Sequence, residues 1–263
     1  MADLPALDVL LPLDSPVRHL APRADEAELV ALFAEHASGP LVRANMVTTL
    51  DGAATGADHV SGSINGPADF RVFRVLRALA DVVLIGAGTA RGERYTALDV
   101  PAELRAARAA AGRADELELA IVTATGELPD RLLDSDRPPL VLTTGSNPAL
   151  GALRERVGAD RVLVADGGTP GAVDPRAAVA ALTGRGLVHV LTEGGPTLLA
   201  QLTDADLLDE LCLTWSPQLV GGPAGRITRL PTWFEPSRAL TPLHLLHADG
   251  VLLGRWRVAR LGA

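Results

Sequence analysis

The sequence predicts an α/β fold: a three-layer α/β/α domain around a mostly parallel central sheet, with antiparallel C-terminal edge strands. Two observations carry this prediction. Up to Asp209, short apolar runs alternate with helical patterns, which is typical of a parallel sheet covered on both faces. After Asp209, apolar runs follow one another with little helix between them, which is typical of antiparallel strands.

The N-terminal segment differs from the rest of the chain. We expect residues 1–39 to be an extension and residues 40–263 to form one domain. Asp25 and Glu28 have capping-box spacing and predict a helix that runs to about His36. Gly39-Pro40 ends this helix.

The domain begins with a strand and the clearest helix of the chain. Residues 41–50 form a predicted strand that leads into a turn at Asp51-Gly52. Asn65 is the expected cap of the helix that follows, and Pro67 suits its first turn. Two sets of side chains recur along this helix. The expected apolar face holds Phe70, Phe73, Leu76 and Leu79, and another side carries Arg71, Arg74 and Arg77.

The remaining elements alternate as a parallel sheet requires. We expect helices at 101–111, 148–157 and 175–183. Between them, we expect strands at 81–85, 120–123, 140–143, 161–165 and 188–192, and in the tail at 211–215, 243–246 and 251–258.

Two of these strands end in glycines and then begin a helix, at residues 83–93 and 191–199. Such a junction brings bare backbone N–H groups up to a phosphate, and two junctions in one domain favour a long ligand such as a dinucleotide. The segment Gly86-Ala87-Gly88 is not the usual dinucleotide fingerprint, because Arg91 occupies the position of its third glycine. The second segment places Glu193 at a strand end, where open sheets bind ligands.

Asp69 allows two interpretations. In the first turn of its helix it is either a surface carboxylate that favours the helix dipole, or a carboxylate that points into a cleft and handles a proton.

Composition excludes several classes of function. The formal net charge is −8 and no dense basic patch occurs, so nucleic acid is an unexpected partner. The chain contains no lysine, and its 24 residues counted as Lys or Arg are all arginine. This excludes Schiff-base chemistry at a lysine. The single cysteine, Cys212, lies in an apolar run and is expected to be a buried hydrophobe.

We expect no metal site, no membrane span and a cytoplasmic protein. His244 and His247 are three apart in a predicted strand, so they point to opposite faces and do not form a metal pair. The N-terminus lacks a basic segment of the secretory type, and no apolar stretch reaches the roughly 18 residues of a spanning helix.

Several segments occur in an order that resembles a known family. They are Thr48-Thr49-Leu50-Asp51-Gly52, Leu76-Arg77-Ala78-Leu79-Ala80-Asp81, Gly86-Ala87-Gly88-Thr89, Thr192-Glu193-Gly194-Gly195, and Leu208-Asp209-Glu210-Leu211 with Pro217 and Gly221-Gly222. Together they resemble the pyrimidine reductase domain of riboflavin biosynthesis, which has a dihydrofolate-reductase-like fold. The resemblance runs from about Val42 to Trp256 and favours the stand-alone, actinobacterial type, since the deaminase half has no counterpart here.

This resemblance implies NADPH as the cofactor, a small heterocyclic substrate and a homodimer. Asp51 is expected to hold a turn. Glu193 and Asp69 are the candidate catalytic residues, and the candidate substrate-binding residues are Asn45, Ser61, Arg77 and Leu98. The candidate cofactor-binding residues are Val47, Ser63, Gly86, Thr89, Glu93, Thr123, Gly194, Gly195, Pro196, Thr197 and Leu198. Asn45 occupies a position where many members carry Lys and others Asn.

The resemblance implies that the substrate is a ribosylaminopyrimidine 5′-phosphate. Family members that bind this phosphate usually carry another arginine shortly after the turn that matches Thr89, near a leucine that matches Leu98. Here Leu98 is followed by Asp99-Val100-Pro101, and the next arginine is Arg105. Asp69 matches the acidic residue with which dihydrofolate reductases bind a pteridine, so a dihydrofolate-type reductase is the alternative. A second alternative is a non-catalytic NADPH-binding protein. The C-terminal strands around Trp215 are expected to supply an edge that pairs between subunits.

Overall fold

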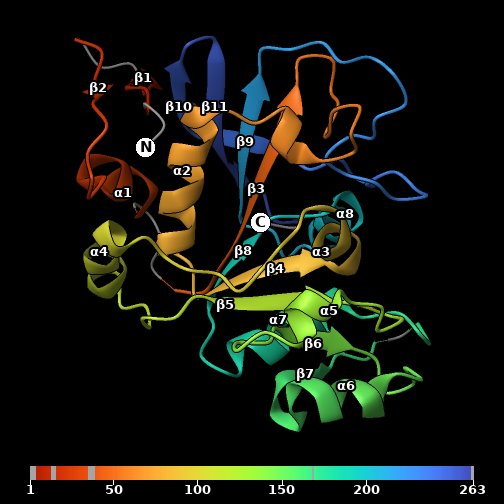
Figure 1. Ribbon diagram of the computed structural model, residues 1–263. Coiled ribbons are helices and arrows are strands. Elements are labelled where there is room, and N and C mark those ends of the chain that lie inside the picture. Colours follow the sequence, from red (N-terminus) through yellow and green to blue (C-terminus); the bar gives the residue numbers. More distant parts are fainter. Residues whose placement is uncertain (1–3, 13–15, 35–38, 168, 262–263) are drawn as a thin grey trace.

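The computed structural model describes residues 4–12, 16–34, 39–167 and 169–261, and within these ranges it contains one eleven-stranded sheet (Figure 1). The strands lie in the order β2 (His19–Leu20), β1 (Leu7–Leu11), β10 (Leu240–Ala248), β11 (Val251–Val258), β9 (Glu210–Ser216), β3 (Leu41–Thr49), β8 (His189–Thr192), β4 (Val82–Gly86), β5 (Glu118–Val122), β6 (Leu140–Thr143) and β7 (Val162–Val164).

The sheet is mostly parallel, as the sequence predicts. Every pair from β9 through β3, β8, β4, β5 and β6 to β7 is parallel, and the pairs from β9 to β2 are antiparallel. Apolar runs form the parallel strands because both of their faces are buried. In β4, residues 82–85 are fully buried.

Helices cover both faces of the parallel part. One buried cluster joins α1 (Ala27–Ala34) and α2 (Pro67–Ala78) to Val83 and Ile85, and a second joins α7 (Pro175–Thr183) and α8 (Pro196–Asp204) to Val82 and Leu84. Since alternate strand residues point to opposite faces, the two clusters lie on opposite sides of the sheet. Four short helices flank β4 to β7: α3 (Ala87–Gly92), α4 (Arg105–Ala110), α5 (Asp130–Leu133) and α6 (Leu150–Val157). None of the helices in the described ranges is long and apolar enough to cross a membrane.

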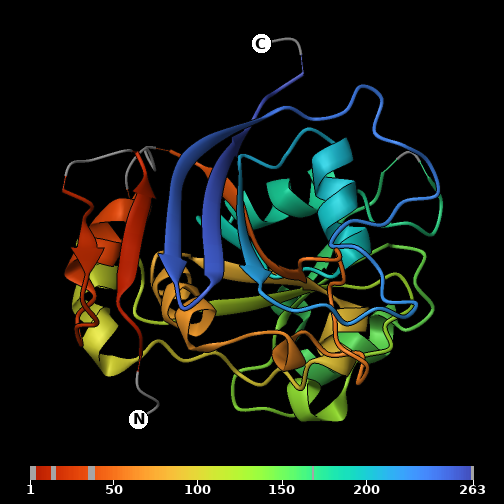
Figure 2. The ribbon, with the colours of Figure 1, turned by 90° about the horizontal axis from the view of Figure 1, so that it is seen from above.

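The N-terminal segment adds to the same sheet. β1 pairs with β10, and Figure 2 shows the red N-terminal strands beside the blue C-terminal hairpin. Glu26 accepts two hydrogen bonds, of 2.8 and 2.6 Å, from the buried guanidinium of Arg71 on α2. At the other end of α1, Arg255 and Arg43 donate to the carbonyl oxygens of Leu32 and Phe33 at 2.9 and 3.0 Å. These contacts fix the segment against the domain.

Two local expectations are wrong, and a third is not tested by the described residues. The N-cap of α2 is Gly66, not Asn65. The side-chain oxygen of Asn65 accepts a hydrogen bond from the backbone amide of Gly66. Phe70 is 48% exposed, because the buried face of α2 holds Val72, Val75 and Leu76 instead. The α1 helix is described to Ala34, and the predicted end near His36 lies outside the described residues.

The expected edge around Trp215 is also wrong, because β9 lies inside the sheet between β3 and β11. Its buried residues face α2, whereas Leu213 and Trp215 are partly exposed on the opposite face. Trp215 contacts the ring of Trp256 edge-to-face, with centroids 4.9 Å apart, and Leu252 lies opposite Trp215. We call the partly exposed side chains of Leu213, Trp215, Leu252 and Trp256 the open sheet face.

Candidate functional site

A continuous cleft lies beyond the carboxyl ends of β4 and β8. A cavity of about 380 Å³ and a second of about 300 Å³ share lining residues, among them Thr89, Glu93 and Gly195. A smaller pocket of about 80 Å³ continues the first cavity toward β3, where Asn45 and Val47 line it. The cleft therefore has the position that ligand sites take in open parallel sheets.

An ion pair lies at the floor of the 380 Å³ cavity. Arg77, in the last turn of α2, donates from Nε and Nη2 to Oε1 and Oε2 of Glu193 at 2.8 and 2.7 Å. Tyr95 Oη donates to Glu193 Oε2 at 2.5 Å. The Arg77 guanidinium lies over the ring of Phe73, 4.0 Å from its centroid. The Glu193 side chain is only 4% exposed, so these donors compensate a carboxylate that has lost most of its water.

The neighbours of Glu193 hold their protons firmly. Burial, followed by the Glu193 carboxylate, raises the pKa of Tyr95 well above its usual value, so its hydroxyl remains a donor. Burial lowers the pKa of Arg77, but the charge and hydrogen bonds of Glu193 outweigh this effect, so the pKa of Arg77 is raised overall. Glu193 Oε1 accepts a single hydrogen bond, and Arg77 Nη1 makes none within the part of the chain that the structure describes. The pair therefore offers a ligand one acceptor and one donor side by side.

Asp69 lies in the smaller pocket and is 4% exposed. Thr214 Oγ1 of β9 donates to Asp69 Oδ1 at 2.5 Å. Burial raises the pKa of Asp69 to about 6, although the hydrogen bonds from Thr214 and Asn65 lower it. This carboxyl group is therefore able to hold a proton near neutral pH, and it lines the same pocket as Glu193.

Glycine backbone builds the other half of the cleft. Gly86 donates its amide to the Gly194 carbonyl oxygen at 2.9 Å, which joins the end of β4 to the turn before α8. Gly195 caps α8, and a Cβ added there would lie 2.8 Å from Thr89 Oγ1. The 300 Å³ cavity lies against the first turn of α8, where Thr197 and Leu198 line it. An anionic phosphate suits this place, because helix N-termini present free amides and positive potential.

The structure brings most of the predicted site residues together. Those that line the cleft are Asn45, Val47, Ser61, Asp69, Arg77, Gly86, Thr89, Glu93, Leu98, Glu193, Gly195, Pro196, Thr197 and Leu198. Gly194 shapes the turn behind them through its bond to Gly86.

Two predicted residues lie elsewhere. The Ser63 hydroxyl donates to Asp58 and to the Val60 carbonyl oxygen on the exposed side of its turn. Thr123 is 3% exposed, and its hydroxyl accepts from the Gly126 amide at 2.9 Å. Both hydroxyls thus hold their own turns.

Sequence reasoning missed Tyr95 and misplaced Phe73, which lines the cleft rather than the core. The signal for Tyr95 was that the sole tyrosine of the chain lies two residues after Glu93 and three residues after the glycine that ends α3. Asn65 and Arg94 also line the cleft.

The expectations that Asp51 holds a turn and that Cys212 is buried are confirmed. Asp51 holds a turn: it accepts from Thr49 Oγ1 and, at 2.8 Å, from the Gly221 amide. Cys212 is buried, which raises its pKa to about 12. His244 is buried against Phe33, and burial lowers its pKa to about 3. No group of metal-ligating side chains occurs in the described ranges.

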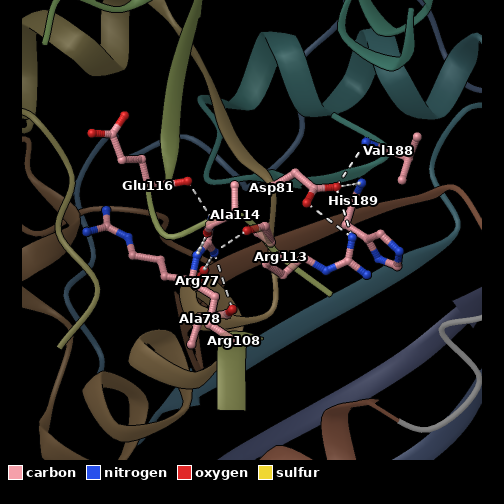
Figure 3. Close-up of polar contacts among 10 residues, drawn as sticks. Arg77, Ala78, Asp81, Arg108, Arg113, Ala114, Glu116, Val188 and His189 are labelled. Atoms are coloured by element: carbon pink, nitrogen blue, oxygen red, sulfur yellow. Dashed lines mark hydrogen bonds and ion pairs between the residues drawn. The ribbon is translucent and has the colours of Figure 1, made fainter. Parts of the chain in front are cut away.

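A polar layer away from the cleft aligns the elements that carry the ion pair (Figure 3). Asp81 Oδ2 accepts from the amides of Val188 and His189 at 3.0 and 2.8 Å, and both of its oxygens accept from Arg113. Arg108 is 1% exposed and donates to carbonyl oxygens at the end of α2, including that of Ala80 at 2.6 Å. These contacts fix the end of α2 relative to the start of β8.

Comparisons with known proteins agree with this geometry. The model of the RibD C-terminal domain matches residues 40–249. A pyrimidine reductase-like protein from Corynebacterium diphtheriae is 26% identical, with a TM-score of 0.73, over 88% of this chain and 95% of that chain. No curated protein sequence matches the chain.

Two further solved structures share the fold. RibD from Acinetobacter baumannii is 19% identical, with a TM-score of 0.64; the alignment covers 89% of this chain and 63% of that longer one. The riboflavin biosynthesis reductase Rib7 from Saccharomyces cerevisiae is 15% identical, with a TM-score of 0.56, over 84% and 90% of the two chains. The expected fold class is thereby confirmed.

Proposed function

The chain belongs to the RibD C-terminal domain family of riboflavin-biosynthesis reductases, and we propose from this premise that it is an NADPH-dependent pyrimidine reductase. Its substrate in this proposal is 5-amino-6-ribosylaminouracil 5′-phosphate or the 2,5-diamino precursor, which it reduces to the ribityl form. The observation that carries the proposal is the Arg77–Glu193–Tyr95 cluster, which faces a cavity continuous with the first turn of α8.

The residues present fit a dinucleotide. The absence of a side chain at Gly195 keeps the space beside Thr89 open, and the α8 N-terminus is suited to a pyrophosphate. Gly195, Thr197 and Leu198 would hold this group, and Val47 lies toward the substrate pocket where a nicotinamide would meet it. When bound, NADPH supplies a hydride to an electrophilic carbon.

The chain's own residues orient the substrate and manage a proton. Glu193 Oε1 accepts a ring N–H of the pyrimidine, and Arg77 Nη1 donates to an adjacent carbonyl oxygen. Tyr95 fixes the Glu193 carboxylate in place. Asp69, with its raised pKa, holds a proton at the end of the pocket that Asn45 also lines. Alignment and electrostatics are thus the contribution of the protein.

NADPH oxidation by the purified protein tests this proposal. We expect turnover with the ribosylaminopyrimidine 5′-phosphate and none with dihydrofolate. Turnover of dihydrofolate alone contradicts the pyrimidine assignment. Tight NADPH binding without turnover of either compound would make the protein a non-catalytic nucleotide-binding protein.

Asp69 supports a second candidate, a dihydrofolate-type reductase. A buried carboxyl with a pKa of about 6 in a pocket for a heterocycle is suited to protonate a pteridine. For this candidate, Asp69→Asn lowers the rate with dihydrofolate by about two orders of magnitude, the usual scale for a positioned proton donor.

We also propose a homodimer that forms through the open sheet face. Its four apolar side chains are large and adjacent, and they belong to the paired strands β9 and β11. Sedimentation tests this: Trp215→Arg should convert a dimer to a monomer, and Leu219→Asp, on an exposed loop outside this face, should not. A monomeric wild-type protein, or a dimer that survives Trp215→Arg, contradicts the proposal.

A further inference from the structure

The 380 Å³ cavity is lined by four charged side chains, and three of them have partners. Arg77 and Glu193 bind each other, and Glu93 Oε1 accepts the backbone amide of Ser61 at 2.8 Å. The fourth, Arg94, makes no side-chain hydrogen bond and no ion pair within residues 4–12, 16–34, 39–167 and 169–261. Arg94 is exposed, so its side chain is free to pair with an anion that enters the cavity.

The backbone on both sides of Arg94 is held firmly. Glu93 donates its amide to the Thr89 carbonyl oxygen at 2.9 Å and binds Ser61 through its side chain. Tyr95 binds Glu193 through its hydroxyl, and its own carbonyl oxygen accepts from Arg131 Nε at 3.1 Å. The backbone that carries the Arg94 side chain is thus fixed at the edge of the cavity.

Arg94 also adopts a left-handed backbone conformation, with φ of 50°. This region costs a residue with a Cβ about 1–2 kcal/mol relative to the right-handed one. Neighbouring contacts offset this cost here, and such conformations recur at ligand clamps. The conformation places consecutive side chains so that Tyr95 reaches Glu193 while Arg94 lines the same cavity.

We propose that Arg94 binds the phosphate of a phosphomonoester substrate, an inference that rests on the proposed function. A guanidinium forms paired, charge-assisted hydrogen bonds with phosphate oxygens. Ser61 and Thr96 line the same cavity; the Thr96 hydroxyl donates to the Ala97 carbonyl oxygen at a long 3.4 Å, and either hydroxyl can turn toward a phosphate. Arg105, the first arginine after Leu98, lies on α4 and does not line the cleft. Arg94 thus supplies the positive charge for the phosphate, and it precedes Leu98 in the sequence instead of following it.

Equilibrium binding tests this assignment without relying on turnover. The probes are 5-amino-6-ribitylaminouracil and its 5′-phosphate, titrated into the NADPH-loaded protein by calorimetry. We expect the wild-type protein to prefer the phosphate, and Arg94→Gln to weaken binding of the phosphate about 10- to 100-fold while binding of the unphosphorylated probe is unchanged. Arg94→Lys should keep part of the preference. Arg91→Gln is the matched control, because Arg91 binds the Glu127 carbonyl oxygen outside the cleft.

The possible results separate this inference from the proposed function. A wild-type protein that binds both probes equally, or an Arg94→Gln protein that keeps the full preference, overturns the role of Arg94 and leaves the pyrimidine assignment standing. A wild-type protein that binds neither probe overturns the pyrimidine assignment, and the role of Arg94 with it.

Discussion

The buried carboxyl of Asp69 makes stability depend on pH in a calculable way. The rise of its pKa from 3.8 to about 6 corresponds to about 3 kcal/mol of preference for the protonated form in the folded state, at 1.36 kcal/mol per pKa unit. Because the folded-state pKa is the higher one, this contribution is fully present below pH 4 and is lost as the pH rises through 6. About half of it, roughly 1.4 kcal/mol, is lost between pH 5 and pH 8.

Asp69→Asn removes this titration and keeps a side chain that can accept from Thr214. We expect the free energy of unfolding of the variant, relative to wild type, to rise by about 1.4 kcal/mol from pH 5 to pH 8. Urea unfolding followed by circular dichroism at several pH values measures this difference, and titrations that both proteins share cancel. Asp58→Asn is the control, since hydrogen bonding lowers the pKa of that exposed carboxyl and it does not titrate in this range. A difference between Asp69→Asn and wild type that is constant from pH 5 to pH 8 would refute the reasoning.

Three further substitutions test the cleft and the attachment of the N-terminal segment. Gly195→Asp should abolish NADPH binding, by fluorescence titration, because it places a carboxylate beside Thr89 at the α8 N-terminus, and Gly151→Ala on exposed α6 should not; unchanged affinity would disprove the assignment. Glu193→Gln should lower kcat about 10- to 100-fold with unchanged NADPH affinity, and an equal loss of both would move this residue to the cofactor side. Glu26→Gln should cost about 3–5 kcal/mol in urea unfolding, since it leaves the buried Arg71 without a counter-charge; a loss below about 1 kcal/mol would contradict this.

The strands and the glycine junctions could be predicted because their signals are local. The runs that end at Gly86 and before Glu193 carry both an apolar pattern and the glycines that follow it. The helix at Pro175–Thr183 matches its prediction residue for residue, because Asp174 caps it and Pro175 starts it. A single stretch of sequence contains everything that determines such elements.

Features that depend on distant partners could not be predicted. Arg71 is buried because Glu26, 45 residues earlier, supplies its counter-charge, and this places an arginine on the buried side of α2 while Phe70 is exposed. β1 and β2 are short strands, and β1 is held by β10 from the other end of the chain. Tyr95 meets Glu193 across 98 residues. No local periodicity reports such pairings.

Asp81, the last residue of the segment 76–81 that resembles the family, also acts through a partner that is distant in the sequence. Its carboxylate does not reach the cleft but binds the amides at the start of β8, while Glu193 follows the end of that strand. The segment thus begins on α2, which carries Arg77, and ends at Asp81, which aligns β8. Glu193, the partner of Arg77, follows the end of β8. A bidentate pair requires both side chains in register, since a shift of one strand residue reverses the direction of Glu193. Asp81 is therefore a positioning residue whose loss would disturb the Arg77–Glu193 pair without touching a ligand.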